Sequence, residues 1–234
     1  MRPSRCTLLF LALPILVAGC EGPAPTPSVA EGEARACDNE YMPVVEGATW
    51  TYKRMTSQGD RTQQAVILDV SENAFVLGVT LTDISYEEAW MCTEEGLVQL
   101  ETAGSPYTAA FAGPDGNVRL STVDSDGVTL PASFDVGDEW DQTTQVQISS
   151  SAFNGLATIS HEFSAVRSEP ITVAGTEFQA VVVEVSSTLE IPQFSFEFKS
   201  VQWYVRGVGL VKLEGQMTEP EFDVSYELVG YSVP

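Results

Sequence analysis

The chain has 234 residues, and its 33 acidic residues outnumber its 11 Lys and Arg residues, so the formal net charge is −22. A charge of this size repels phosphate backbones and anionic lipid headgroups, so we expect no nucleic-acid partner and no membrane attachment through a basic patch. Once a leader and a linker are set aside, about 200 residues remain, which is the size of one domain.

The N-terminus predicts export. A basic start containing Arg2 and Arg5 precedes an apolar run from Cys6 to Val17, which is too short to remain as a bilayer-spanning helix. This pattern is typical of a secretory signal.

The predicted signal ends in Val17-Ala18-Gly19-Cys20. These four residues resemble the lipobox of bacterial lipoproteins. The resemblance implies that residues 1–19 are a signal peptide, that Cys20 becomes the acylated N-terminus, and that acyl chains such as palmitate anchor the protein to a membrane. Glu21, in place of the aspartate that retains some lipoproteins at the inner membrane, favours the outer membrane at its periplasmic face or the cell surface. The alternative is an ordinary signal peptide that leaves Cys20 free to pair with another cysteine.

The next segment, Glu21 to Ala36, is rich in proline, glutamate and small residues. Such a composition buries little surface, so we predict a disordered tether over residues 20–36 and a β-rich domain over residues 37–234. Two cysteines remain in the exported domain, Cys37 and Cys92, and an oxidising compartment favours a disulfide between them. We expect no bound metal, because the chain has a single histidine and no Cys-x-x-Cys motif.

From Tyr41 onward, short alternating runs are separated by Gly, Pro, Asn and Asp, which is typical of antiparallel strands. Residues 103–127 are the least regular part, with space for one short strand around Val118 to Leu120. A partial calcium-loop pattern at Asp124 to Gly127 lacks the carboxylates that calcium requires, so we interpret it as a solvated turn. The predicted strands are 50–53, 64–70, 75–81, 87–93, 97–101, 118–120, 142–149, 157–163, 178–185, 194–205, 210–215 and 222–228.

One of these segments changes its pattern midway. Phe194, Phe196 and Phe198 alternate with polar residues, after which the apolar positions shift to Val201, Trp203 and Val205. An extra residue near Ser200 would move side chains to the other face, so we predict a bulge or bend there. We therefore predict an all-β protein with little helix: a single antiparallel, strongly curved sheet or open half-barrel of about 10–12 strands.

A curved sheet of this size can enclose an apolar cavity. The three phenylalanines are one candidate lining, and His161 and Phe163 are another, because they share a strand face with Ala157 and Ile159. The predicted ligand-binding residues are therefore His161, Phe163, Phe194, Phe196 and Phe198. A packed core would use the same residues. Trp50 and Trp140 each follow a Gly-x-x spacing at the start of a strand, where we expect a structural role rather than sugar stacking.

Three motifs stand out in the chain: Tyr41-x-Pro43-x3-Gly47-x2-Trp50-x-Tyr52, then Val173 to Phe178, and Trp203 to Lys212. Together they resemble an uncharacterised group of secreted and lipid-anchored bacterial β-proteins that is often labelled TapB-like. The resemblance implies an exported β domain and carries over no chemistry. Its Gly207-Val208-Gly209 sequence is best interpreted as a tight hairpin turn.

We expect no catalytic residues and no cofactor. The chain has neither Gly-x-Ser-x-Gly nor His-Glu-x-x-His, and the carboxylates of Glu87-Glu88 or Asp138-Glu139 would point to opposite faces of a strand. The sequence favours a non-catalytic, lipid-anchored envelope protein whose β domain binds an apolar or amphipathic ligand or a partner protein. An envelope scaffold without a small-molecule site and a carboxylate-dependent hydrolase are the alternatives.

Overall fold

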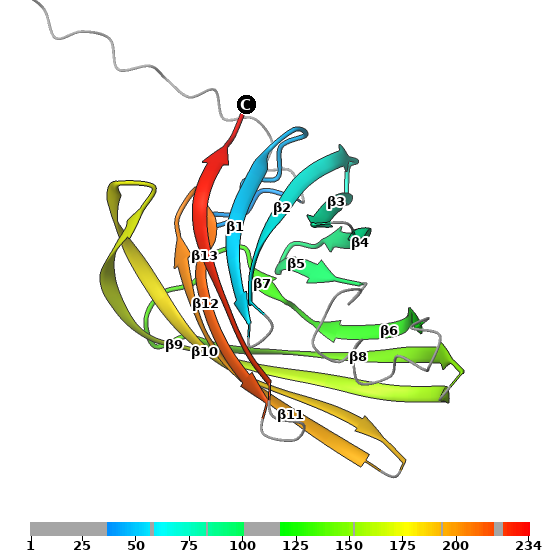
Figure 1. Cartoon of the computed structure of the whole chain (residues 1–234). Coiled ribbons are helices and arrows are strands. Elements are labelled where there is room, and N and C mark those ends of the chain that lie inside the picture. The colour runs from blue at the N-terminus through cyan, green and yellow to red at the C-terminus, as the bar shows by residue number, and fades with distance from the viewer. Residues whose placement is uncertain are drawn as a thin grey trace, which may run out of the picture. The chain divides into compact units, whose positions relative to one another are not determined.

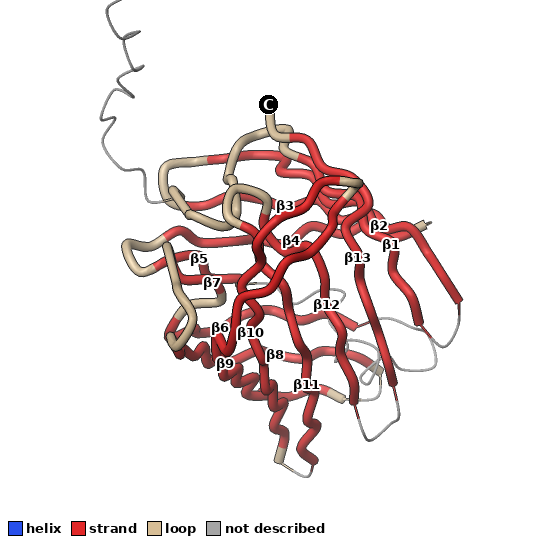
Figure 2. The backbone as a smooth tube through the Cα atoms, turned by 90° about the vertical axis from the view of Figure 1, so that its left-hand side faces the viewer, coloured by secondary structure: helices blue, strands red, loops and turns tan. Residues whose placement is uncertain are grey.

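The computed structural model describes residues 37–56, 59–82, 84–100, 118–151, 153–192, 194–217 and 222–234. Cys20, the predicted signal and the tether lie outside the described residues. In the described part of the chain, the regular elements are all strands (Figure 2). A helix that could span a membrane does not occur in that part.

The strands form one antiparallel sheet in the order β6-β8-β9-β10-β11-β12-β13-β1-β2-β3-β4-β5-β7 (Figure 1). This confirms the predicted single all-β sheet, although it contains thirteen strands. The sheet is not closed, because its edge strands β6 and β7 are not paired with each other. In chain order the strands are β1 Thr49–Thr56, β2 Gly59–Val70, β3 Ala74–Leu81, β4 Ile84–Cys92, β5 Gly96–Gln99, β6 Val118–Gly127, β7 Leu130–Pro131, β8 Glu139–Ser150, β9 Asn154–Val173, β10 Thr176–Ile191, β11 Phe194–Val205, β12 Gly209–Met217 and β13 Phe222–Ser232.

Most strands extend beyond their predicted limits, β6 and β9 among them. The region expected to be loop contains β6, whose polar residues pair with β8 from Val118 to Gly127, while residues 101–117 lie outside the described residues. Strand β9 continues through Pro170 to Val173. Proline is accommodated there because the ladder between β8 and β9 ends at Ser164, so β9 has no β8 partner at that level.

The predicted bulge near Ser200 is wrong. Pairing between β10 and β11 runs without a shift from Val181 opposite Tyr204 to Ile191 opposite Phe194. The apolar positions change parity because both faces are covered here: the indole N–H of Trp203 donates to Glu169 Oε1 of β9 over 2.7 Å. The polar residues Ser200 and Gln202 of β11 occupy the other face of the strand, where they line a cavity.

The two edge strands, β6 and β7, follow each other in the chain, and residues 127–131 connect the two ends of the sheet. We call this segment the seam. The amide of Val128 donates to Asp141 O of β8 over 3.0 Å, and that of Thr129 to Leu97 O of β5 over 2.9 Å. The side-chain hydroxyl of Thr122 also reaches Leu100 O. The seam brings the two ends of the sheet together without a ladder between β6 and β7.

A glycine marks the end of β6 in the seam. Gly127 has φ +76°, and a Cβ there would collide with the carbonyl oxygen of Asp141. Glycine is therefore required both by backbone conformation and by the close approach of β8.

The segment before β1 is tied to the sheet at one end. Cys37 forms a disulfide with Cys92, as predicted, with a Cα–Cα distance of 4.9 Å. The Tyr41 hydroxyl donates to Phe134 O over 2.8 Å, and its ring stacks on Phe134 at 4.0 Å. The Arg206 guanidinium lies 3.0 Å from Glu40, so the segment contacts β4, the connection between β7 and β8, and the turn between β11 and β12.

Candidate functional site

The candidate site is on the face of the sheet that carries Phe163 and Val185, which we call the inner face. The described part of the chain has four fully buried polar side chains, and register places all of them on this face. With the partly buried His161 they form a set that we call the polar row: Gln142, Thr144, His161, Ser187 and Ser200. Burying polar groups costs free energy unless they are hydrogen-bonded, so a row of them within one face is unusual.

Strand pairing builds the polar row. Gln142 of β8 is opposite His161 of β9, and His161 is opposite Ser187 of β10. Ser200 of β11 lies opposite Val185, two residues before Ser187.

The polar row separates two apolar clusters. On β9, Phe163 belongs to the first cluster and Ile159 to the second, with His161 between them. On β10, Val185 and Leu189 flank Ser187 in the same way. The inner face is therefore apolar, then polar, then apolar along the strands.

His161 is held within the polar row by a hydrogen bond of 2.7 Å between Nδ1 and Ser187 Oγ. Burial lowers the pKa of His161 to about 4. The imidazole is therefore neutral at pH 7, and it can either donate or accept a hydrogen bond through its second ring nitrogen.

The inner face encloses a cavity of about 350 Å³. Its walls are mainly aromatic and aliphatic side chains from strands on both sides of β1, with the polar row contributing His161, Ser187 and Ser200. The aromatic lining consists of Trp50, Tyr52, Tyr86, Trp90, Phe163, Phe198, Tyr204 and Tyr226.

The wall opposite the polar row carries two charged side chains, Arg54 of β1 and Glu88 of β4. The Arg54 guanidinium carbon lies 5.5 Å from the centroid of the Tyr226 ring. Burial raises the pKa of Tyr86, and the negative charge of Glu88 adds to that effect, so the phenol stays protonated.

Two nitrogen donors of this wall have no hydrogen-bond partner among the described residues, although both atoms are buried. They are Arg54 Nε and the indole Nε1 of Trp90. Because an unsatisfied buried donor costs about 1–3 kcal/mol, such groups require a physical explanation.

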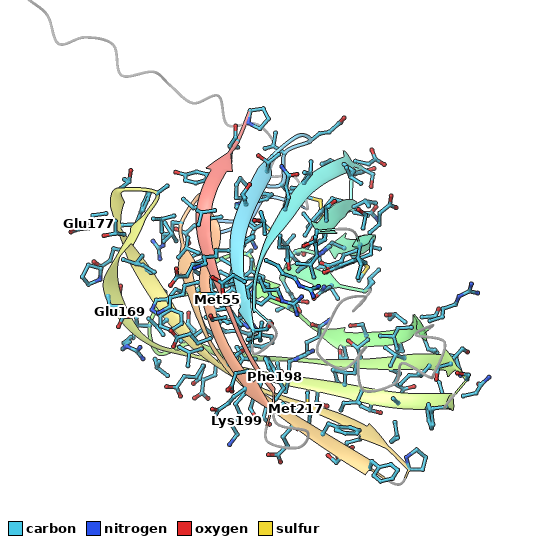
Figure 3. All side chains as sticks on the ribbon, viewed as in Figure 1. Met55, Glu169, Glu177, Phe198, Lys199 and Met217 are labelled. Carbon is cyan, nitrogen blue, oxygen red and sulfur yellow. A yellow bond between two sulfur atoms is a disulfide. The ribbon has the colours of Figure 1, made fainter. Side chains whose placement is uncertain are left out.

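The five predicted ligand residues do not lie together. His161, Phe163 and Phe198 line the cavity. Phe194 is 63% exposed, and Phe196 packs against the second apolar cluster outside the cavity lining. Figure 3 places Phe198 beside Met217, its partner on β12, with Lys199 directed to the opposite side of the sheet.

Sequence reasoning missed Arg54, Trp90, Ser187, Ser200 and Gln202 as cavity residues. A signal existed for Ser187, because it interrupts the inward-facing valine and leucine positions of β10. The parity change in β11 was a second signal. It marked Ser200 and Gln202 as inward polar positions rather than a bulge.

The two predicted structural tryptophans are well supported by contacts. Trp50 is 3% exposed and donates to Val208 O over 2.6 Å, while Tyr52 donates to Leu210 O over 2.9 Å. Trp140 stacks on Phe163 at 5.2 Å. Trp50 and Tyr52 belong to the first sequence motif, and their acceptors Val208 and Leu210 belong to the third. Packing of these two motifs against each other therefore explains both.

A wider hollow of about 1450 Å³ crosses the opposite face of strands β8 to β13. It is acidic, with one lysine, Lys199, among the carboxylates Glu139, Asp141, Glu162, Glu184, Glu214 and Asp223. Within the described residues, no group of three or more His, Cys, Asp or Glu side chains is arranged to hold a metal ion. These acids follow from the high net charge and define no separate site.

The His161 and Ser187 pair has the residue types of a base and a nucleophile. However, Ser187 lies in the middle of β10 with strands on both sides, where ladder hydrogen bonds use the backbone N–H groups. Backbone donors are therefore not free to stabilise an oxyanion beside Ser187, and only side-chain donors could do so. Both side chains of the pair can form a hydrogen bond to an oxygen or nitrogen group of a ligand.

Comparison with known proteins defines the fold. A scan against protein-family models gives no match, and a search of curated proteins gives none either. The chain is similar to a protein from Bacteroides fragilis, provisionally described as exported and with a YmcC-like fold, with a TM-score of 0.55 and 17% identity over 83% of this chain and 100% of that chain.

A second solved structure is similar over a comparable length. It is provisionally described as a lipoprotein from Parabacteroides distasonis, with a TM-score of 0.56 and 16% identity over 84% of this chain and 99% of that chain. At such low identity these likenesses show the fold alone, which is YmcC-like. The TapB-like resemblance rests on its three short motifs.

Proposed function

We propose that this chain is a lipid-anchored envelope protein whose β domain binds an apolar or amphipathic molecule in the inner-face cavity. The observation that carries the proposal is the cavity itself, which is lined by aromatic side chains and crossed by the polar row. Ligand sites in proteins are mainly apolar with a few placed polar groups, and volumes of roughly 300–1,000 Å³ are typical.

The anchoring part of the proposal is supported by the lipobox-like Val17-Ala18-Gly19-Cys20. The fold relative from Parabacteroides distasonis is itself provisionally described as a lipoprotein, and the Bacteroides fragilis relative as an exported protein. A tether of residues 20–36 would let the domain reach molecules at the membrane surface.

Labelling cells with radioactive palmitate tests the anchor. Wild-type protein should take up the label, whereas Cys20→Ala should not. Label retained by the variant would contradict acylation at Cys20.

Blocking the cavity tests the binding role. Ala65 lines the cavity and is 6% exposed, while its neighbour Gln64 is exposed on the other face. Ala65→Phe should therefore displace ligand, and Gln64→Phe should not. We expect saturable binding of a fluorescent fatty-acid analogue by wild type and Gln64→Phe, and at least a tenfold weaker affinity for Ala65→Phe.

Circular dichroism and thermal melting of both variants check that they remain folded. If a folded wild-type protein shows no saturable binding of apolar probes, the cavity proposal falls and a partner-protein or scaffold role takes its place.

A further inference from the structure

We infer that the ligand is a single-chain amphiphile without net charge, whose head group presents oxygen acceptors to Arg54 and Trp90. Ester, amide and hydroxyl head groups belong to this class. The inference rests on the proposed function, because it assigns the chemistry of the same cavity.

The donors of the cavity wall provide the first argument. Arg54 Nε and Trp90 Nε1 are both N–H donors without a partner among the described residues, and both residues line the cavity. Neither group can accept a hydrogen bond. A ligand that satisfies them must therefore bring acceptor atoms, and a plain hydrocarbon or an alkylammonium group cannot do so.

The two charges of the wall provide the second argument. Arg54 and Glu88 both line the cavity, so the formal charge of its lining is balanced. An anionic head group would face Glu88 and the field of a chain that carries a net charge of −22. An uncharged head with carbonyl or hydroxyl oxygens supplies the acceptors without that repulsion.

The polar row provides the third argument. His161, Ser187 and Ser200 also line the cavity, and the imidazole and the hydroxyls can each donate or accept a hydrogen bond. They bond to one another or to Gln202, with His161 Nδ1 2.7 Å from Ser187 Oγ and Gln202 Nε2 3.2 Å from Ser200 Oγ. Neutral polar groups on this wall match an uncharged ligand.

The size of the cavity limits the ligand to one chain. About 350 Å³ is at the lower end of the volumes usual for ligand sites. A two-chain phospholipid would exceed that space, whereas one medium-length acyl chain fits it.

Three probes with the same twelve-carbon chain test the head group: 1-dodecanoylglycerol, dodecanoate and dodecylamine. Each probe is titrated into the full-length Cys20→Ala protein at concentrations below the probe's own critical micelle concentration. We expect 1-dodecanoylglycerol to bind about tenfold or more tightly than the other two, as one hydrogen bond to a charged donor predicts.

Substitutions in the cavity wall test whether Arg54 and Trp90 bind the head group. Arg54→Met keeps the aliphatic stem and removes the donors, and Trp90→Phe removes the indole N–H. Each should weaken 1-dodecanoylglycerol binding about tenfold. Arg61→Met is the matched control, because Arg61 is the exposed residue opposite Arg54 on β2 and is outside the cavity lining.

The outcomes separate the two proposals. If none of the probes binds, the cavity proposal itself fails. If all three bind equally and Arg54→Met has no effect, the cavity function stands and the inferred head group is wrong. Tightest binding of dodecanoate would overturn the uncharged class in favour of an anionic ligand.

Discussion

Two tryptophans that line the cavity, Trp50 and Trp90, differ in whether the indole N–H has a hydrogen-bond partner, and this difference matters for stability. The Trp50 indole N–H is bonded to Val208 O, whereas the Trp90 indole N–H has no partner among the described residues. Both rings lie against other apolar groups, and Trp90 stacks on Phe75 at 5.6 Å. Replacement by phenylalanine removes the N–H in each case, so the pair separates a satisfied donor from an unsatisfied one.

Trp50→Phe should destabilise the unliganded protein by about 1–3 kcal/mol, because the carbonyl of Val208 loses its donor in a buried site. Trp90→Phe should cost less than about 1 kcal/mol, because the loss of packing is offset by removal of an unsatisfied donor. Urea denaturation followed by far-UV circular dichroism gives both values. Equal losses would contradict the hydrogen-bond assignment.

His161 gives a pH-dependent prediction. Burial lowers its pKa from 6.5 to about 4, so the unfolded chain binds a proton between these values and the folded chain does not. Its cross-strand partners are the uncharged Gln142 and Ser187. The contribution of neutral His161 to stability is therefore complete above pH 6.5 and is lost as the pH falls towards 4, by about 3 kcal/mol in total.

His161→Gln is the control, because it retains a polar group and removes the titration. Unfolding free energies of both proteins at pH 7.5, 5.5 and 4.5 should converge or cross as the wild type loses stability faster. Parallel curves would show that the imidazole is accessible to protons in the folded state.

At the scale of elements, one buried side chain adds hydrogen bonds that join the two ends of the sheet at the seam. Gln142 Nε2 donates to Gln99 O and Ser125 Oγ, each over 3.2 Å, and its Oε1 accepts from Thr129 Oγ1 over 2.7 Å. Gln142 therefore joins β8 to β5, β6 and the segment between β6 and β7.

Gln142→Ala should destabilise the protein by about 2–4 kcal/mol, because three hydrogen bonds are lost from a site that is 2% exposed. Gln145→Ala is the matched control on the exposed face of the same strand and should change stability by less than about 0.5 kcal/mol. Thermal and urea denaturation compare the two. Similar stability of both variants would show that the seam does not depend on Gln142.

The disulfide is the second connection at this scale. Cys37 and Cys92 are 55 residues apart, and in the chain-entropy model a loop of that length gives about 4 kcal/mol of stabilisation. The double variant Cys37→Ala/Cys92→Ala should lose roughly that amount in urea denaturation. An unchanged midpoint, or two free thiols in the oxidised unfolded wild type, would rule the bond out.

Most strands could be predicted from the sequence because alternation of apolar and polar residues survives in them. The turn at Gly207 and Gly209 was predictable because glycine favours tight turns, and both glycines have positive φ in the structure. Only the start of β6, residues 118–120, was predicted, because the rest of this edge strand is rich in Ser, Thr and Asp and has the composition of a loop. Its structure depends on pairing with β8, which local sequence does not reveal.

The candidate site was predictable in part. Phe163 and His161 were identified from the alternation in β9, and the described geometry places both at the cavity. Arg54, Glu88 and Trp90 come from the opposite half of the sheet, so only the order of strands brings them to the same space. Ser187 and Ser200 were passed over because small polar residues in strands usually face solvent.

For the molecule as a whole, three features support one account. The lipobox-like N-terminus predicts an anchor, the net charge of −22 disfavours nucleic acid and anionic surfaces, and the inner face offers a small apolar cavity with balanced charge. A domain of this kind would hold a neutral amphiphile beside a membrane. The YmcC-like fold is compatible with this account and supplies no chemistry of its own.

Native mass spectrometry tests this account most directly. The full-length Cys20→Ala protein would be exported in its own host and purified without detergent, so that a bound acyl chain cannot be the protein's own anchor. We predict a bound species in one-to-one ratio, identified after denaturation as an uncharged single-chain amphiphile, and its loss from Ala65→Phe but not from Gln64→Phe. Folded protein without bound ligand, which also fails to take up 1-dodecanoylglycerol, would contradict the account.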